Sequence, residues 1–163
     1  MAKPDYPMTT AIRFLREKAI EFQPHLYTYE DYGGTKLSSN ALGVSEHQVV
    51  KTLVFETDER KPILVLMHGD REVSAKQLAR LIGVKRVDPC DEATAQRHTG
   101  YKFGGTSPFG TRHPIPVYAE RSIFELPQIY INGGKRGFLV EIKSLDLLKA
   151  LSITEVDVAV TQV

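Results

Sequence analysis

The chain has 163 residues, of which 42% are hydrophobic and 25% are charged, and its formal net charge at pH 7 is +1. These values are typical of one globular domain, and they exclude both a disordered chain and a strongly basic protein that binds nucleic acid through its overall charge. No apolar run approaches the roughly 20 residues that span a bilayer and the first residues show no signal-peptide pattern, so we expect a single domain over residues 1–163, in the cytoplasm and without a membrane partner.

The first half of the chain alternates between short predicted helices and strands. We expect a helix at 11–20 that Thr9 or Thr10 caps and Pro24 ends, then an extended segment at 25–30 and a helix at 36–42 that Gly43 stops. These are followed by a capping box at Ser45 and Gln48 and by strands at 49–55 and 63–68, which the polar turn between them joins into a hairpin.

The second half contains further strand signals and a long loop. We expect a helix at 75–82 with a capping box at Ser74 and Gln77, a strand at 84–88, a helix at 91–97, a loop rich in Gly and Pro from 101, and a strand at 115–118. A hairpin at 128–142 with its turn at the Asn-Gly pair and a last helix at 145–151 that Ser144 caps complete the chain. The pattern predicts an α/β (α+β-like) fold, with a mixed, barrel-like β-sheet and peripheral helices.

Lys51 is a charged residue on an apolar face of a predicted strand, and its position needs an explanation. Alternate side chains of a strand share a face, so Lys51 lies on the face of Val49, Leu53 and Phe55, which are apolar. Burying the ammonium group would cost more free energy than a surface ion pair recovers. Two interpretations remain open: the side chain reaches water along the core, or it faces a polar cavity.

Two segments rich in glycine are candidate binding loops. In residues 104–110, glycine permits unusual backbone angles and proline stiffens the turn, so the loop can present free N–H groups to a developing oxyanion; the alternative is an ordinary surface turn. In residues 132–137, two adjacent cations can meet phosphate at a hairpin tip, and the alternative is a tip that only contacts water.

Several standard catalytic patterns are missing. Ser107 lacks the Gly-x-Ser-x-Gly context of a hydrolase, and Cys90, the single cysteine, has no nucleophile signature around it. The glycine loop is not a nucleotide P-loop. A metal site would need an unusual assembly, because no metal-binding spacing occurs among the five histidines, His25, His47, His68, His98 and His113. We therefore predict neither a metal nor another cofactor.

Three segments taken together resemble the YbaK family, also called the prolyl-tRNA-synthetase-associated domain: VVKTLVF (49–55), TGYKFGGTSPFG (99–110) and IYINGGKRG (129–137). Their order and spacing match, and the resemblance runs over residues 9–151. It implies the fold of that family and an aminoacyl-tRNA deacylase that clears misacylated tRNA in trans. The implied partners are aminoacyl-tRNA, above all tRNA(Pro), and a prolyl-tRNA synthetase that delivers it, but not DNA.

The resemblance also implies roles for individual residues. Lys51 would line the pocket beside the terminal adenosine of tRNA, and Gly104 with Pro108 would match the family's Gly-x-x-x-Pro loop, whose N–H groups bind the oxyanion. Lys135 and Arg136 would meet tRNA phosphate. Substrate contacts are implied for a further set of residues, which are Tyr29, Thr52, Gly105, Thr106, Ser107, Asn132, Gly133 and Gly134.

The sequence departs from the cysteine-specific members of the family at two positions. Asn132 stands where those members resemble one another in having serine, and Leu139 stands where they carry aspartate. In those members the substrate's own thiol attacks the ester. Cys-tRNA(Pro) is the leading substrate, with alanyl, seryl or another small aminoacyl ester as alternatives that water would attack. The rival functions are a non-catalytic module that binds a tRNA end or nucleotide, and a regulatory or interaction protein with a vestigial pocket.

Overall fold

A computed structural model describes residues 5–161, so residues 1–4 and 162–163 of the predicted domain lie outside the described part. The helices are α1 (Thr10–Glu17), α2 (Gly34–Leu42), α3 (Ala75–Ile82), α4 (Glu92–Thr99) and α5 (Asp146–Ala150), with 3₁₀ turns η1 (Glu46–Gln48) and η2 (Arg121–Glu125). The strands are β1 (Gln23–Leu26), β2 (Val49–Thr57), β3 (Pro62–His68), β4 (Arg71–Val73), β5 (Val87–Pro89), β6 (Val117–Glu120), β7 (Gln128–Lys135), β8 (Phe138–Lys143), β9 (Ile153–Val156) and β10 (Ala159–Thr161).

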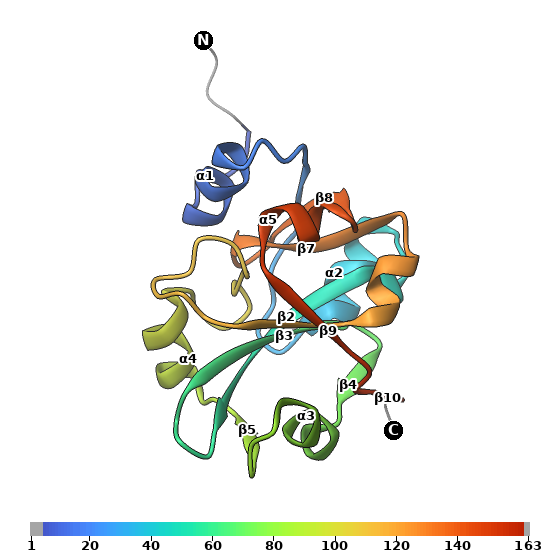
Figure 1. The fold of residues 1–163 in the computed structure, drawn as a ribbon. Coiled ribbons are helices and arrows are strands. Elements are labelled where there is room, and N and C mark those ends of the chain that lie inside the picture. The colour runs from blue at the N-terminus through green and yellow to red at the C-terminus, as the bar shows by residue number, and fades with distance from the viewer. Residues whose placement is uncertain (1–4, 162–163) are drawn as a thin grey trace.

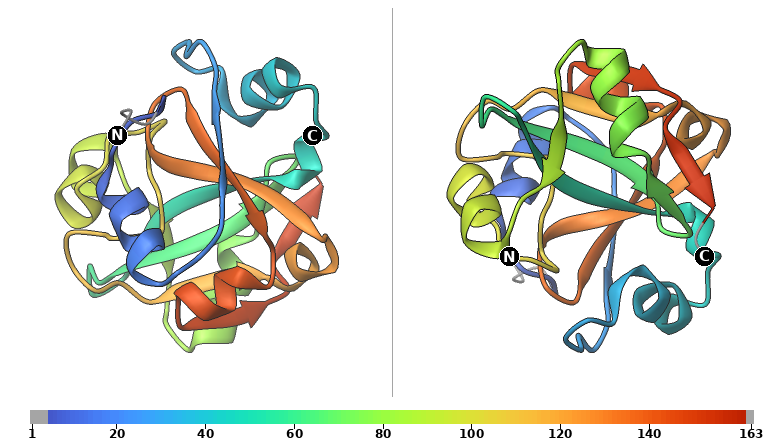
Figure 2. Two further views of the ribbon diagram at one scale, coloured as in Figure 1. Left: turned by 90° about the horizontal axis from the view of Figure 1, so that it is seen from above. Right: turned by 90° about the horizontal axis from the view of Figure 1, so that it is seen from below.

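Two antiparallel hairpins form the centre of a mixed sheet with strand order β1-β8-β7-β2-β3-β6-β9. The β2–β3 hairpin joins the β7–β8 hairpin through a short parallel contact between β2 and β7, which pairs Val49 with Tyr130 and Val50 with Ile131. The helices lie at the periphery, with α1 and α3 at opposite ends of the molecule (Figures 1 and 2). The predicted mixed, barrel-like α/β fold is confirmed. None of the helices within residues 5–161 is long and apolar enough to cross a bilayer.

The β2–β3 hairpin is apolar on both faces because a separate core packs against each. One core contains Val50, Leu64 and Leu66 together with side chains of α1, β7 and β8. The other contains Phe55 and Met67 together with side chains of α3. Two buried faces explain why these strands read as nearly continuous apolar runs in the sequence, and they hold β2 rigidly.

The first helix ends earlier than predicted. Thr9 caps it as expected, because its side chain accepts a hydrogen bond from the first turn. The helix stops at Glu17, and Ala19 adopts a φ of 56°, which turns the chain away. Pro24 therefore does not end the helix but lies within β1.

Two predicted caps are wrong in detail. The Ser45 side chain accepts from the His47 N–H and begins a single 3₁₀ turn, so it forms no capping box with Gln48. The Ser144 hydroxyl donates to the Leu126 carbonyl oxygen and does not cap α5. By contrast, Ser74 accepts from the N–H three residues later, as a cap of α3 should.

The strands also differ from the prediction in the position of one hairpin turn and in three additional strands. Asn132 and the glycines after it lie within β7, and the hairpin turn is at Arg136 and Gly137, because a bulge between Asn132 and Lys135 shifts the register. Strands β4, β9 and β10 were not predicted. Two of them have only three residues, and all are fixed by long-range pairing: β9 with β6, and β10 with β4.

The middle of β2 lies at an open edge of the sheet. On one side β2 pairs with β3 over most of its length, but on the other side β7 reaches only Val50 and β5 begins only at Phe55. In the described part of the chain, no strand pairs with this edge between those two residues. The gap leaves room for a cleft whose floor is β2.

Candidate active site

A cleft of about 1080 Å³ lies along the open edge of β2. Its walls come from the segment before α2, the first turn of α2, the loop after α4, β4 and the β7–β8 hairpin. The cleft brings together seven residues that were predicted from the sequence and lie in four distant segments: Tyr29, Lys51, Thr52, Gly104, Thr106, Asn132 and Arg136.

The side chain of Lys51 projects into this cleft and is half-buried. Its Nζ donates a hydrogen bond of 3.3 Å to the Gly69 carbonyl oxygen. Thr35 Oγ1 lies 3.2 Å from the same oxygen and shares its hydrogen with Glu46 Oε2, which is 2.8 Å away. Of the two interpretations that the sequence left open, the structure supports the polar cavity. Gly69 had no side-chain signal that could have revealed this contact.

Gly104 faces Lys51's cleft from the loop after α4 and lies directly against Tyr29. Its φ is +84°, and a Cβ added there would lie 2.6 Å from the Tyr29 hydroxyl oxygen. Both the left-handed backbone and the close approach require glycine at this position. The phenol of Tyr29 therefore packs on the main chain of the loop.

Two side chains of the β7–β8 hairpin, which also line the cleft, hold the same loop. Asn132 Nδ2 donates to the Gly104 carbonyl oxygen at 2.9 Å, and Arg136 Nε donates to the Phe103 carbonyl oxygen at 2.7 Å. The Arg136 guanidinium also lies 5.1 Å from the centre of the Tyr29 ring, a cation–π distance. These contacts engage the carbonyl groups of Phe103 and Gly104 and hold the loop against the β7–β8 hairpin.

The loop presents free hydrogen-bond donors. Within residues 5–161, the N–H groups of Thr106 and Ser107 donate to no protein acceptor, whereas the Gly105 N–H is engaged by the Lys102 carbonyl at 2.8 Å. Thr106 lines the cleft, whereas Ser107 is fully buried. A free N–H such as that of Thr106 can bind a carbonyl oxygen as it becomes an oxyanion.

Six other residues selected from the sequence lie behind the cleft wall or beside it. The side chain of Ser107 is fully buried, and its Oγ accepts from the Phe109 N–H, which gives it a structural contact. Gly105 and Gly133 have no room for a side chain. A Cβ at Gly105 would lie 2.9 Å from the main-chain nitrogen of Arg136, and a Cβ at Gly133 would lie 2.5 Å from the Phe138 ring. The remaining three are Pro108, which is buried, Gly134, which is half-buried, and Lys135, which is exposed.

Thr52 is the one described residue with a buried side-chain polar atom, Oγ1, that has no hydrogen-bond partner. An unsatisfied buried hydroxyl costs about 1 to 3 kcal/mol. Its main-chain groups point toward the open edge, because in an antiparallel pair alternate residues bond to the partner strand and Gly69 N–H already bonds to Val49. The floor of the cleft thus offers the main-chain polar groups of Thr52.

Comparison with known proteins decides the family. The model for the aminoacyl-tRNA editing domain matches residues 33–150. The chain belongs to the aminoacyl-tRNA editing domain family. The YbaK-type resemblance in the sequence is therefore confirmed, and the editing domain contains every part of the cleft wall from α2 to the β7–β8 hairpin.

Relatives of this editing domain include both short proteins and parts of synthetases. It is 27% identical to "Putative Cys-tRNA(Pro)/Cys-tRNA(Cys) deacylase EbsC" of Enterococcus faecalis, over 82% of each chain. It is 30% identical to a proline–tRNA ligase of Brachyspira hyodysenteriae over 77% of this chain, and the match spans only 21% of that ligase. A crystal structure of "a putative trans-editing enzyme for prolyl tRNA synthetase" superposes with a TM-score of 0.81 at 21% identity, over 97% of this chain and 100% of the other.

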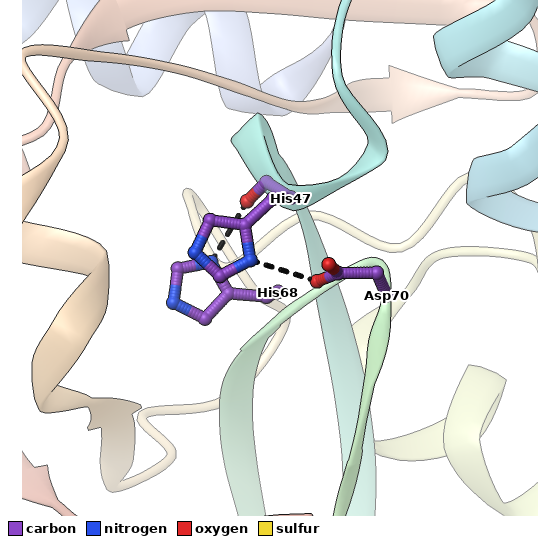
Figure 3. Close-up of side chains that lie close together, drawn as sticks. All are labelled: His47, His68 and Asp70. Atoms are coloured by element: carbon purple, nitrogen blue, oxygen red, sulfur yellow. Dashed lines mark hydrogen bonds and ion pairs between the residues drawn. The ribbon is translucent and has the colours of Figure 1, made fainter. Parts of the chain in front are cut away.

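The editing domain also contains a polar cluster that the sequence did not reveal, formed by His47, His68 and Asp70 (Figure 3). Their candidate ligand atoms lie within 4.8 Å of one another. The two imidazole rings are stacked, with centroids 3.7 Å apart and planes 7° from parallel. A metal ion lies about 2 Å from a ring nitrogen and in the plane of the ring, so one ion cannot satisfy both rings. The arrangement does not fit a metal centre.

Cys90 lines the cleft of the editing domain but is a poor nucleophile. Burial, together with Glu56 and Asp91, raises the pKa of Cys90 to about 12. A raised pKa means that the thiol stays protonated at neutral and mildly alkaline pH, and only the thiolate reacts quickly. We expect iodoacetamide to label Cys90 in the folded protein at pH 8 at least ~10-fold more slowly than after unfolding in urea. The Cys90→Ser variant should keep deacylation within about twofold of wild type; a large loss would mean that the thiol takes part.

Proposed function

We propose that this editing domain deacylates misacylated tRNA in trans and that Cys-tRNA(Pro) is its leading substrate. The observation that carries the proposal is the Lys51 ammonium, which the Gly69 carbonyl holds on the floor of a cleft that Thr106, whose N–H has no described acceptor within residues 5–161, also lines. A cation and an unpaired donor are what an ester with a nearby phosphate requires. The name of the Enterococcus relative supports the same activity.

In the proposed reaction the protein binds and positions the ester but supplies no nucleophile. The sulfur of the cysteinyl group attacks the ester carbonyl carbon, the carbon–sulfur bond forms, and the carbon–oxygen bond to the terminal ribose breaks. The thiol proton passes to the ribose oxygen, so that the products are a cyclic thiolactone and uncharged tRNA. Positioning of this kind lowers the barrier because attack within one molecule needs no encounter.

Each proposed contact has a stated task. Lys51 neutralises charge at the terminal adenosine, Thr52 contacts the same end through the main-chain groups that it turns to the open edge, and the N–H groups of the loop at Gly104–Pro108 bind the oxyanion. Leu139 forms an apolar part of the wall and is only 4% exposed. An apolar wall favours a thiol or a methyl group over a hydroxyl, which would lose its hydrogen bonds to water. Cysteine and alanine therefore rank above serine.

The proposed partners are tRNA(Pro) and a prolyl-tRNA synthetase that delivers it, because a net charge of +1 gives the domain only a weak grip on RNA by itself. The relation to proline–tRNA ligases supports this pairing. Lys135, which is exposed at the end of β7, and the neighbouring Arg136 are proposed phosphate contacts. Such an enzyme works where tRNA is charged, in the cytoplasm.

The test is deacylation of tRNA(Pro) charged separately with cysteine, S-methylcysteine, alanine, serine and proline. Loss of cysteine, with S-methylcysteine stable, is expected for attack by the thiol. Loss of S-methylcysteine or alanine as well would keep the enzyme class but assign the attack to water. If the folded protein binds tRNA(Pro) yet releases none of these amino acids, the domain is a binding module for tRNA ends, and the proposed activity is wrong.

A further inference from the structure

Gly69 is the residue through which the Lys51 side chain is held. Its carbonyl oxygen accepts from Lys51 Nζ and lies 3.2 Å from Thr35 Oγ1, and its N–H donates to the Val49 carbonyl at 2.6 Å. A Cβ at Gly69 would lie 2.6 Å from Thr35 Oγ1 and 2.8 Å from the Glu46 carbonyl oxygen. The direction of the Gly69 carbonyl is therefore set by what holds its two neighbours in the chain, His68 and Asp70.

His68 is anchored at both ring nitrogens although it lies on an otherwise apolar strand. It is 1% exposed, its Nδ1 is 2.8 Å from the His47 carbonyl oxygen, and its Nε2 is 2.7 Å from Ser122 Oγ. A carbonyl can only accept, so Nδ1 carries the hydrogen and the neutral ring accepts from the Ser122 hydroxyl at Nε2. Burial lowers the pKa of His68, which is consistent with a neutral ring.

The other side of Gly69 is anchored as firmly. Asp70 Oδ1 accepts from His47 Nδ1 at 2.9 Å, and Asp70 Oδ2 accepts from Arg71 at 2.9 Å. His47 stacks on His68 (Figure 3), so one residue of η1 touches both neighbours of Gly69. The charged and titratable groups around His68 in this cluster are His47, Asp70 and Arg71.

We infer that His68 is a positioning residue for Lys51: by bonding to the His47 carbonyl and to Ser122, it fixes the Gly69 carbonyl that holds the lysine ammonium in the cleft. The catalytic part of this inference rests on the proposed function, but the anchoring of Lys51 does not. His68 touches no cleft surface itself. It acts only through the main chain of the next residue.

The test compares two replacements of His68, one that keeps a hydrogen bond to the His47 carbonyl and one that removes both hydrogen bonds of the ring. Asparagine carries an N–H₂ donor near the position of Nδ1, so His68→Asn keeps the bond to the His47 carbonyl, whereas His68→Leu removes both bonds. In His68→Leu we expect kcat for deacylation to fall about tenfold with little change in KM, since one positioned hydrogen bond of roughly 1.4 kcal/mol is lost from the reacting state. His68→Asn should recover most of that loss.

A second readout follows Lys51 without any catalysis. Slow reductive methylation with peptide mapping gives the reactivity of each lysine, with the exposed Lys61 as an internal standard. In His68→Leu we expect Lys51 to be labelled at least threefold faster relative to Lys61, and in His68→Asn as in wild type. Equal Lys51 labelling in folded wild type and His68→Leu would overturn the inference, whatever the activities.

Two outcomes keep the inference separate from the proposed function. If wild type deacylates nothing but Lys51 labelling still depends on His68, the positioning role stands and the proposed function fails. If His68→Leu does not fold, Ser122→Ala removes only the bond at Nε2. Ser122→Ala should then raise Lys51 labelling in the same direction, and an unchanged ratio of Lys51 to Lys61 contradicts the inference.

Discussion

Replacing Lys51 with alanine should lower the single-turnover rate of deacylation on the order of 10²- to 10³-fold, because it removes a preorganised positive charge from the cleft. The side chain has one described partner, the Gly69 carbonyl, and is half-buried, so the fold should tolerate the change. The measurement is single-turnover deacylation of Cys-tRNA(Pro) at saturating enzyme.

The matched control for this variant is Lys61→Ala. Lys61 is exposed and only 3.5 Å from the Glu59 carboxylate, a surface pair worth roughly 0 to 1 kcal/mol. Its loss should leave the rate unchanged. A Lys51→Ala protein that is folded and retains more than a third of the wild-type rate would remove Lys51 from the proposed mechanism.

The second large effect is expected from Gly104→Ala. The alanine would have to adopt a φ of +84°, and its Cβ would lie 2.6 Å from the Tyr29 hydroxyl, so the loop and the Tyr29 side chain must move apart. Displacement of the N–H donors by about 1 Å is enough to reduce kcat by on the order of 10²-fold. The measurement is kcat, with thermal unfolding to confirm that the protein is folded.

Gly83→Ala separates this displacement from simple backbone strain. Gly83 has a φ of +76° at the end of α3, but a Cβ there meets no atom within 4 Å. The left-handed conformation costs about 1 to 2 kcal/mol in either variant. We expect Gly83→Ala to lose stability and keep its rate. If both variants lose stability alike and both keep their rates, the Gly104 loop has no catalytic task.

Local signals in the sequence predicted much of the fold. The capping of α1 by Thr9 and of α3 by Ser74, together with the hairpins around Lys51 and Asn132, depends on neighbours within a few residues. The three-residue strands β4 and β10 could not be predicted, because their conformation is set by pairing with each other across more than eighty residues of sequence.

The candidate site also combines residues that local sequence signals identify with residues that only the folded chain reveals. Lys51 was identifiable because a charged side chain interrupts an apolar face, and the loop at Gly104 because glycine and proline mark it. Gly69 was not identifiable, because it acts through its main-chain carbonyl oxygen, and the pattern of side chains in the sequence does not indicate such a contact. The cluster of His47, His68 and Asp70 joins two elements that only the folded chain brings together, so no sequence spacing indicates it.

The short contact between β2 and β7 also affects how firmly the sheet is joined beside the cleft. Only two residue pairs join these strands, and the cleft begins where they end. We expect amide hydrogen exchange to be faster at this joint than in the long antiparallel pairs on either side, because two residue pairs contribute few backbone hydrogen bonds. The floor of the cleft therefore begins where the central sheet is joined by its shortest pairing.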